Sequence, residues 1–287
     1  MKRISILIPT FNDACYGLVS DLVSQAQALA TDYEVIVADD ASDNPSVIAD
    51  NRRINLLPHC RYIERNENVG RAAIRNYLVQ ESHYPWLLFI DSDMHLCRDG
   101  FLASYQKDSS QPVVYGGIVI GNVQDDNLRS LYEKAAAPLH TVAHRSESPY
   151  ADFHTANFMV RRDIMVEHPF DTRFRYYGYE DVLLGKTFQQ YGIGIAHIDN
   201  PVSFEVFESN DDFLKKTEEG LRTLHQFRSE LCGYSRLLDI VSNYRLLMPA
   251  VRLWHRLFGR WERSMLAGPH PNLTVFKLYR LGYYLSL

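Results

Sequence analysis

The chain has 287 residues, of which 46% are hydrophobic and 23% charged, as in an ordinary globular protein with a sizeable core. Its net charge of -5 argues against a nucleic-acid partner, because such binders carry a strong basic excess near the working face. The four cysteines are widely spaced with no C-x-x-C pair, which excludes a zinc ribbon or disulfide scaffold and favours a reduced, cytoplasmic protein. No apolar run approaches the roughly 20 residues of a membrane-spanning helix.

The chain begins with two predicted strands joined by a helix. Residues 4–8 form an apolar run that stops at Pro9-Thr10-Phe11-Asn12, and residues 33–38 form a second run that stops at Asp39. A right-handed crossover makes such a pair parallel. The polar ends of both strands therefore share one edge of the predicted sheet.

A third short strand, at 61–64, precedes a predicted helix that starts near Asn68 and Gly70. Asn68 is expected to cap this helix, and Gly70 gives a ligand access to its first turn. Arg71 and Arg75 lie one turn apart on one helix face, which suits a phosphate or another anion. A solvated arginine face is the alternative interpretation of the same pattern.

Residues 86–90 form an apolar run that stops at Asp91-Ser92-Asp93. Such a run predicts a buried strand that delivers both carboxylates to the edge where ligands bind in α/β sheets. The two carboxylates repel each other unless a divalent cation lies between them, and Mg²⁺ or Mn²⁺ takes hard oxygen ligands. A polar turn that closes a core strand is the alternative.

Later segments predict a strand at 113–120, a helix at 126–137 and a polar loop at 139–153. Tyr177-Gly178-Tyr179-Glu180-Asp181 then brings aromatics and two acids to the head of a helix. Acids in a first turn are often only partners of the helix dipole. Aromatic faces beside carboxylates also suit a sugar, so Tyr177, Tyr179 and Glu180 are predicted to bind an acceptor.

The last part of the chain is predicted to consist of amphipathic helices that carry most of the basic excess. Residues 236–287 hold eight Lys/Arg against two acids, or +6, so the remainder of the chain carries -11. Residues 246–261 pair apolar and aromatic residues with arginines, which suits a helix lying on an anionic membrane surface. Packing on the rest of the protein or in a homodimer is the alternative. We expect a catalytic domain at 1–205 and a helical extension at 206–287.

Together these segments resemble the family 2 glycosyltransferases, which are inverting enzymes of the GT-A fold, over roughly residues 1–205. The matching segments, in the family's order, are residues 6–12, 37–43, 68–76, 91–93 and 177–181. The resemblance implies an α/β protein with a Rossmann-like, mostly parallel sheet flanked by helices. It also favours the metal interpretation of Asp91 and Asp93.

The resemblance implies a role for each matching segment. Asp39 would accept the uracil N–H, Asp93 would bind Mn²⁺ or Mg²⁺ directly, and Asp91 would approach the ribose or the outer shell of the metal. Asp181 would be the general base, and His197, after a strand at 193–197, would complete the metal site as in related galactosyl- and hexosaminyltransferases. The implied nucleotide-binding residues are Pro9, Thr10, Phe11, Asn12, Asp39, Asn68, Gly70, Arg71, Arg75, Asp91 and Ser92.

The expected function is therefore metal-dependent transfer of one sugar from a nucleotide-sugar, with UDP favoured, to a glycan or lipid-linked glycan in polysaccharide or glycolipid synthesis. Phe11 stands where the family more often has tyrosine and Ala41 where it has glycine. The Gln-x-x-Arg-Trp segment of processive synthases is missing, which favours one sugar per encounter. A nucleotidyltransferase and a non-catalytic binding module are the alternatives. The expected location is the cytoplasm or the inner face of its membrane.

Overall fold

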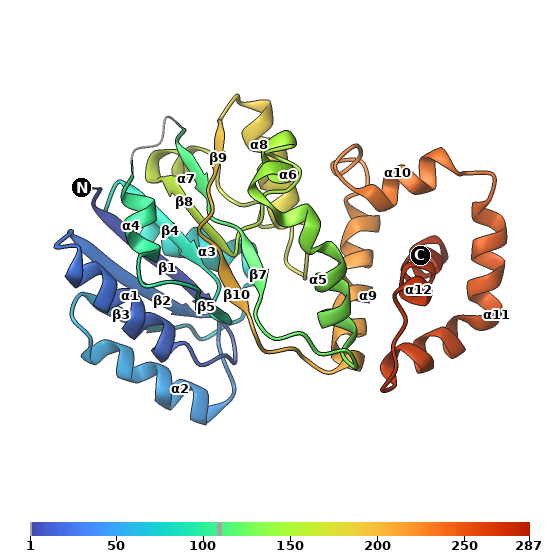
Figure 1. Ribbon diagram of the computed structural model, residues 1–287, viewed down its shortest axis with the longest axis horizontal. Coiled ribbons are helices and arrows are strands. Elements are labelled where there is room, and N and C mark those ends of the chain that lie inside the picture. The colour runs from blue at the N-terminus through green and yellow to red at the C-terminus, as the bar shows by residue number, and fades with distance from the viewer. Residues whose placement is uncertain (1, 108–110) are drawn as a thin grey trace.

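The computed structural model describes residues 2–107 and 111–287, and its centre is a seven-stranded sheet (Figure 1). The strands of this sheet are β1 (Ile4–Thr10), β2 (Tyr33–Asp39), β3 (Cys60–Glu64), β4 (Trp86–Ile90), β6 (Val113–Tyr115), β8 (Asn157–Arg161) and β9 (Ile195–His197). Their spatial order is β3-β2-β1-β4-β8-β6-β9, with β8 antiparallel to both of its neighbours. The predicted parallel pair of β1 and β2 is confirmed, and the carboxyl ends of β1, β2 and β4 lie at one edge.

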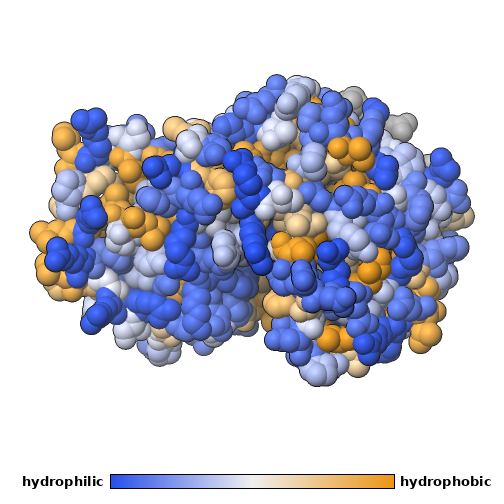
Figure 2. All heavy atoms as spheres, turned by 180° about the vertical axis from the view of Figure 1, so that it is seen from behind, coloured by the Kyte–Doolittle hydropathy of each residue, from blue (hydrophilic) through white to orange (hydrophobic). Residues whose placement is uncertain are grey.

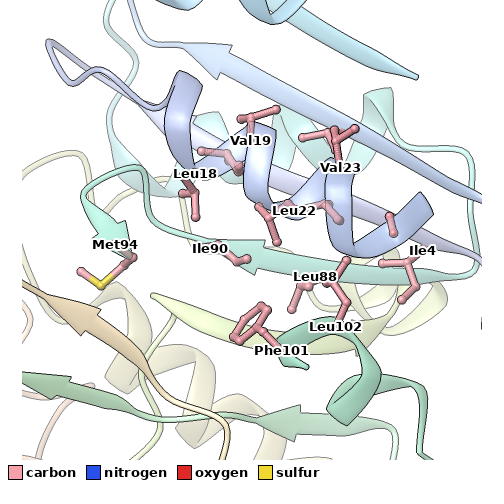
Figure 3. Packing of buried hydrophobic residues seen from close by; sticks show 14 of the residues in the cluster. Ile4, Leu18, Val19, Leu22, Val23, Leu88, Ile90, Met94, Phe101 and Leu102 are labelled. Carbon is pink, nitrogen blue, oxygen red and sulfur yellow. The ribbon is translucent and has the colours of Figure 1, made fainter. Parts of the chain in front are cut away.

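Alternate side chains of the strands enter two cores, one on each face of the sheet. Ile4 belongs to the first core and Leu7 to the second. The first core is covered by α1 (Tyr16–Ala28), whose Leu18 and Leu22 point toward Leu88 of β4 (Figure 3). Helix α4 (Phe101–Gln106) lies on the same face, and α2 (Pro45–Arg52) with the 3₁₀ turn η1 (Arg53–Leu56) connects β2 to β3. Helices α3 (Arg71–Glu81), α7 (Arg162–Glu167) and α8 (Glu180–Gln190) contribute to the second core.

The strand predicted at 113–120 is two strands, because the chain leaves the large sheet after β6. It joins a small sheet of β5 (Met94–Leu96), β10 (Val202–Phe204) and β7 (Ile118–Ile120). The break falls at Gly116 and Gly117. A Cβ at Gly116 would lie 2.4 Å from the side chains of Asn157 and Tyr105, and Gly117 has φ of +95°. Only glycine permits this close approach and this backbone.

The polar stretch predicted as a loop at 139–153 is partly helical. After α5 (Leu128–Ala136), the chain forms the 3₁₀ turn η2 (Ala137–His140) and then α6 (Val142–Glu147). Helix α6 is capped by the Thr141 side chain and held by Arg145, whose guanidinium is buried over the Tyr115 ring at 4.7 Å. The contact between the buried arginine and the aromatic ring orders this segment, although its polar composition predicts a solvent-exposed loop.

The C-terminal helices form the end of the molecule farthest from β3 (Figure 1). They are α9 (Asn210–Gln226), α10 (Arg236–Asn243), α11 (Met248–Ala267) and α12 (Leu273–Ser286). Phe213, Leu266 and Phe276 from this group share a buried cluster with Leu128 of α5, so the helices pack on the sheet-bearing part. The division at residue 205 stays a prediction. No helix in the described ranges is long and apolar enough to cross a membrane.

Candidate active site

The nucleotide side of the predicted site is built from the loops that follow β1 and β2. The buried carboxylate of Asp39 accepts the Ser42 N–H at 2.7 Å through Oδ1 and the Tyr62 hydroxyl through Oδ2. Asn12 sits at φ of 54°, and its Oδ1 accepts the N–H groups of Asp43 and Asn44, both at 3.0 Å. These bonds tie the two loops together. Of the other predicted residues here, Thr10 is buried, Pro9 is half-buried and Phe11 is half exposed.

The start of α3 is anchored by Asp40, which was not among the predicted site residues. Its two carboxylate oxygens accept the N–H groups of Val69 and Gly70, each at 2.9 Å. Gly70 has φ of +87°, and a Cβ there would lie 2.4 Å from the carbonyl oxygen of Arg175. The helix is capped at Gly70, so the expectation of a cap at Asn68 is wrong, and Asn68 is exposed.

Arg75 is the hub of the site. Its side chain is buried, and its Nη2 lies 2.6 Å from Asp91 Oδ1 while its Nη1 lies 3.6 Å from Glu180 Oε1. Arg71 is more exposed, lies 4.0 Å from the same Glu180 oxygen and covers the Tyr177 ring at 4.8 Å. The buried Glu180 has a raised pKa because burial disfavours its charge, which the arginines only partly offset. The structure thus joins the predicted arginine helix to both acidic motifs.

Asp93 differs from Asp91 in having no arginine within salt-bridge distance in the described part of the chain. Desolvation and, to a smaller extent, the charges of Asp91 and Asp13 together raise the pKa of Asp93 to about 6. Asp13 also has a raised pKa because it is partly buried, although the neighbouring Ser92 opposes the rise. Its Oδ2 is buried with no hydrogen-bond partner among the described residues. Asp13, Asp91 and Asp93 therefore repel one another near the end of β4, and of the three only Asp91 has an arginine within salt-bridge distance among the described residues.

This crowding fits a divalent cation. Asp91 and Asp93 offer hard oxygen ligands, and each raises the electrostatic cost of the other when no cation is present. No three His, Cys, Asp or Glu side chains in residues 2–107 and 111–287 come together as a complete metal cluster. A cation here would therefore take its remaining ligands from a bound diphosphate and water, as Mg²⁺ commonly does.

Asp181 lies in the first turn of α8, after two left-handed residues, Gly178 at φ of 93° and Tyr179 at φ of 71°. Its Oδ1 accepts the Val182 N–H at 2.8 Å, and its Oδ2 lies 2.9 Å from Nδ1 of His154. A carboxylate can only accept, so Nδ1 of His154 donates. Burial alone would raise the pKa of Asp181, but the hydrogen bond and charge of His154 outweigh it and hold that pKa below its usual value.

The same pairing raises the pKa of His154, since the hydrogen bond and charge of Asp181 outweigh the effect of burial. Both side chains stay accessible, with 34% of His154 and 21% of Asp181 exposed. The His154 ring also meets the rings of Tyr115 and His140 edge-on, at 6.3 Å and 5.7 Å between centroids. Asp181 is therefore a held, charged carboxylate that a substrate can reach.

Helix α9 packs against the residues that are predicted to bind an acceptor. The Tyr177 carbonyl accepts the Thr223 hydroxyl at 3.2 Å, and Gly220 faces the Tyr177 ring closely enough that a Cβ would lie 3.6 Å from it. Tyr179 packs against a cluster that includes Leu221 and Leu224 of α9. The predicted acceptor-binding aromatics thus rest on the C-terminal helices.

His197 lies apart from the predicted metal ligands. Its Nε2 is 3.0 Å from the Pro149 carbonyl, its Nδ1 is 3.4 Å from Arg145 Nη1, and its ring meets Tyr115 edge-on at 5.5 Å. Burial lowers its pKa to about 4. Both ring nitrogens are thus engaged at β9, and the structure does not bring this histidine to Asp91 and Asp93. Its role as a ligand stays a prediction.

Besides Asp40, two further residues at the site were not predicted from the sequence. Asp13 stands in a turn next to four predicted residues, and its acidic side chain after a strand was the available signal. His154 follows the polar stretch that was expected to be a loop, 27 positions before its partner Asp181. No local spacing points to that pair.

Comparisons with known proteins bear on this arrangement. Residues 5–168 match the family model described as Glycosyl transferase family 2. A curated relative, the poly(ribitol-phosphate) beta-N-acetylglucosaminyltransferase TarP of Staphylococcus aureus, is 27% identical over 140 residues, which are 47% of this chain and 42% of TarP. The matched segment thus spans less than half of that relative's length.

Two solved structures resemble nearly the whole chain. The mannosyltransferase PcManGT of Pyrobaculum calidifontis, in complex with GDP-Man and Mn²⁺, has a TM-score of 0.54 at 14% identity and covers 99% of this chain and 85% of its own. TarS 1–349 of S. aureus in complex with UDP-GlcNAc has a TM-score of 0.51 at 16% identity and covers 99% and 87%. These likenesses concern the fold, and the predicted GT-A fold is confirmed.

Proposed function

The chain belongs to glycosyl transferase family 2, and on that premise we propose that it transfers one sugar from a nucleotide-sugar to an acceptor hydroxyl with inversion. The observation that carries this proposal is the network that joins Asp91, Arg75 and Glu180 and places Asp181 next to Glu180. Donor-binding and acceptor-binding segments are thereby held in one rigid unit. Such positioning can lower the barrier to transfer between two bound substrates by about 7–11 kcal/mol.

The donor lies along the carboxyl edge in this proposal. The loops tied by Asn12 and the Asp39 carboxylate receive the base and ribose, and Arg71 lies near the phosphates. We favour a UDP-sugar because a carboxylate at Asp39 accepts an N–H such as that of uracil. Asp93 would hold a divalent cation, with Asp91 beside it, and such a cation would supply positive charge to the leaving diphosphate.

Asp181 acts as the general base. Its lowered pKa keeps it deprotonated at neutral pH, and its carboxylate accepts the proton of the acceptor hydroxyl. The oxygen of the acceptor hydroxyl forms a bond to the anomeric carbon of the donor sugar, while the bond from this carbon to the diphosphate oxygen breaks. The electron pair leaves with the nucleoside diphosphate. A general base supplies about 10²- to 10⁴-fold, so positioning supplies much of the rest.

His154 is a positioning residue for this base. Its Nδ1–H fixes one oxygen of Asp181, and the Val182 N–H fixes the other, so the carboxylate plane cannot rotate. Each oxygen keeps a further lone pair for the acceptor hydroxyl. The acceptor is proposed to be a hydroxyl on a glycan or polyol-phosphate polymer, the class named for the TarP relative.

A donor screen tests this function. The protein is incubated with UDP-glucose, UDP-GlcNAc or GDP-mannose, with and without Mn²⁺, and nucleoside diphosphate release is followed. Release of UDP that needs Mn²⁺ and rises with an acceptor supports the proposal. Conversion of a sugar phosphate and a nucleoside triphosphate into pyrophosphate would identify a nucleotidyltransferase instead. Calorimetric binding of the donors without any release would identify a binding module.

A further inference from the structure

The outer surface of the C-terminal helices concentrates exposed apolar side chains. Nine large apolar residues are exposed within 240–261, against eight in all described residues before 240. They are Ile240, Tyr244, Leu246, Leu247, Leu253, Trp254, Leu257, Phe258 and Trp261. Leu246 is 87% exposed, Leu257 66% and Trp261 56%. Together with Arg252, Arg256 and Arg260, these residues are called the outer face. Figure 2 shows apolar and strongly hydrophilic residues side by side at this end of the molecule.

Contacts of α11 with the interior of the protein determine the orientation of this helix. Glu262 is fully buried, accepts the Trp254 indole N–H at 2.8 Å and lies 3.1 Å from Nδ1 of His255. A Cβ at Gly282 of α12 would lie 2.5 Å from Cβ of His255, so the two helices cross closely there. These contacts orient α11 so that the outer face lies toward solvent.

Three arginines run along one edge of the apolar strip. Arg252, Arg256 and Arg260 are spaced by four residues, so they lie on one side of α11, and all three are exposed. None of them has an acidic partner in the described parts of the chain. By contrast, Arg263 on the inner side lies 2.8 Å from Asp211 and 2.9 Å from Glu218. The outer charges are therefore available for an anionic partner.

We propose that the outer face binds the surface of an anionic lipid bilayer, with the apolar strip at the level of the headgroups and the arginines on lipid phosphates. Leucine, phenylalanine and tryptophan next to arginines are the composition of helices that lie in a membrane surface. Residues 236–287 carry +6 while the rest of the chain carries -11, so the negative bilayer attracts this end and repels the other.

A second copy of the chain fits this face less well. A two-fold interface brings the same patch of both copies together. The unpaired arginines of one copy would then lie near those of the other, and no acids on the outer face offset that repulsion. The inference concerns membrane binding alone and does not depend on the proposed sugar transfer.

Vesicle binding tests the proposal on the full chain. The protein is mixed with vesicles of phosphatidylcholine alone or with 30% phosphatidylglycerol, on the order of a bacterial-type surface charge, and bound protein is measured by co-sedimentation. We expect binding to the anionic vesicles that weakens at high salt, because screening shortens the reach of the charges. Two of the three tryptophans lie on the outer face, so their fluorescence should shift to shorter wavelength on binding.

Two variants and one control separate the contributions. Changing Arg252, Arg256 and Arg260 to Gln should weaken binding about 100-fold, since each basic residue at an anionic surface contributes about fivefold. Leu257→Gln with Trp261→Gln should weaken binding at all salt concentrations and reduce the fluorescence shift, because Trp254 is then the one tryptophan left on the outer face. The control changes Arg52, Arg53 and Arg61 to Gln, which alters the net charge equally at the other end of the molecule. It should bind as the wild type does.

Three outcomes would overturn the proposal. The first is the absence of binding to anionic vesicles at low salt. The second is equal weakening by the control and by the outer arginine variant, which would indicate attraction by net charge alone. The third is a concentration-dependent dimer in sedimentation velocity that Leu257→Gln with Trp261→Gln dissociates while vesicle binding is unchanged, which would assign the face to a second copy.

Discussion

Arg75 and Arg256 show two ways in which this molecule uses an arginine. Arg75 is buried between Asp91 and Glu180, with its nearest carboxylate oxygen at 2.6 Å. Arg256 lies in solvent on the outer face with no acidic partner in the described residues. A buried charge must be paired within the protein, because desolvation is expensive, whereas an exposed charge is free to meet a partner from outside.

The same difference extends to the surroundings of each arginine. At the carboxyl edge Arg75 pairs with Asp91 and Glu180, and His154 pairs with Asp181, so these side chains are held in place before any substrate arrives. At the outer face the fold orients the helix but leaves its charges and apolar side chains uncommitted. The comparison teaches that paired charges mark where the chain fixes geometry, and unpaired ones mark where it presents a surface. Substitutions at the carboxyl edge and on the outer face test this difference.

The largest effect is expected for Asp181→Asn. An amide cannot accept the proton of the acceptor hydroxyl, so turnover should fall by about 10²- to 10⁴-fold. Nucleotide affinity, measured by calorimetry, should remain, since Asp181 lies on the acceptor side. Turnover like that of the wild type would show that Asp181 is not the general base and that its pairing with His154 does not serve catalysis.

Arg75→Met should have the largest effect on stability. It leaves Asp91 and the buried Glu180 without their shared partner, and breaking a buried pair in this way typically costs about 3–5 kcal/mol. The free energy of unfolding in urea measures this loss. Arg71→Met is the matched control, because this arginine is more exposed and lies farther from the same Glu180 oxygen. Similar losses in both variants would contradict the role of Arg75 as the hub.

His154→Gln should lower kcat/KM by about 10- to 100-fold, as is typical when a group that orients a functional side chain is removed. It should also change the pH profile. His154 holds the pKa of Asp181 low, so without it that pKa rises and the acidic limb of kcat/KM moves to higher pH. His83→Gln is the control, because His83 lies beside Glu34 at the amino end of β4 and contacts neither His154 nor Asp181 among the described residues. If the acidic limb of kcat/KM does not move in His154→Gln, His154 only packs against the site and does not set the pKa of Asp181.

The pair should also make stability depend on pH. His154 has a raised pKa, so its contribution is complete below the ordinary histidine value and is lost as pH rises through the raised pKa. Asp181 has a lowered pKa, so its contribution is present above the ordinary aspartate value and is lost as pH falls through the lowered pKa. The difference in Tm between wild type and His154→Gln should be greatest between these two limits. A difference that does not vary with pH would show that the pair is not ionised.

Arg256→Gln is expected to have the smallest effect. An exposed arginine with no acidic partner contributes little to folding, so Tm should stay within about 2 °C of the wild type. Differential scanning calorimetry without lipid measures this. A clear loss of stability would mean that Arg256 makes a contact within the protein, and it would contradict the difference between Arg256 and Arg75.

The parts of the fold that could be predicted from the sequence are those with local patterns. Apolar runs that stop at polar residues gave β1, β2 and β4 and placed Asp39 and Asp91 at one edge. The break at Gly116 depends on Asn157 and Tyr105, which are 41 and 11 positions away, so an uninterrupted apolar run concealed it. Local sequence patterns predict that a strand exists, whereas the end of β6 depends on the close approach of residues that are distant in the sequence.

The candidate site follows the same rule. Residues that adjoin strand ends were found, but the bond between His154 and Asp181 joins segments that meet only in the folded protein. Ala41, noted as a departure from the family's glycine, sits at φ of 65°, which explains why glycine suits this position. His197 was proposed from resemblance alone. Its contact with Arg145 depends on α6, a helix that the polar composition of this stretch did not predict.

The contact between Tyr177 and α9 has a practical consequence for protein engineering. A truncated chain that ends at residue 205 would keep the whole central sheet but lose Thr223 and Gly220, which lie behind the acceptor segment. Chimeras that exchange acceptor preference between relatives should therefore transplant α9 together with residues 177–181. The two stretches form one module, although about 30 residues separate them in the sequence.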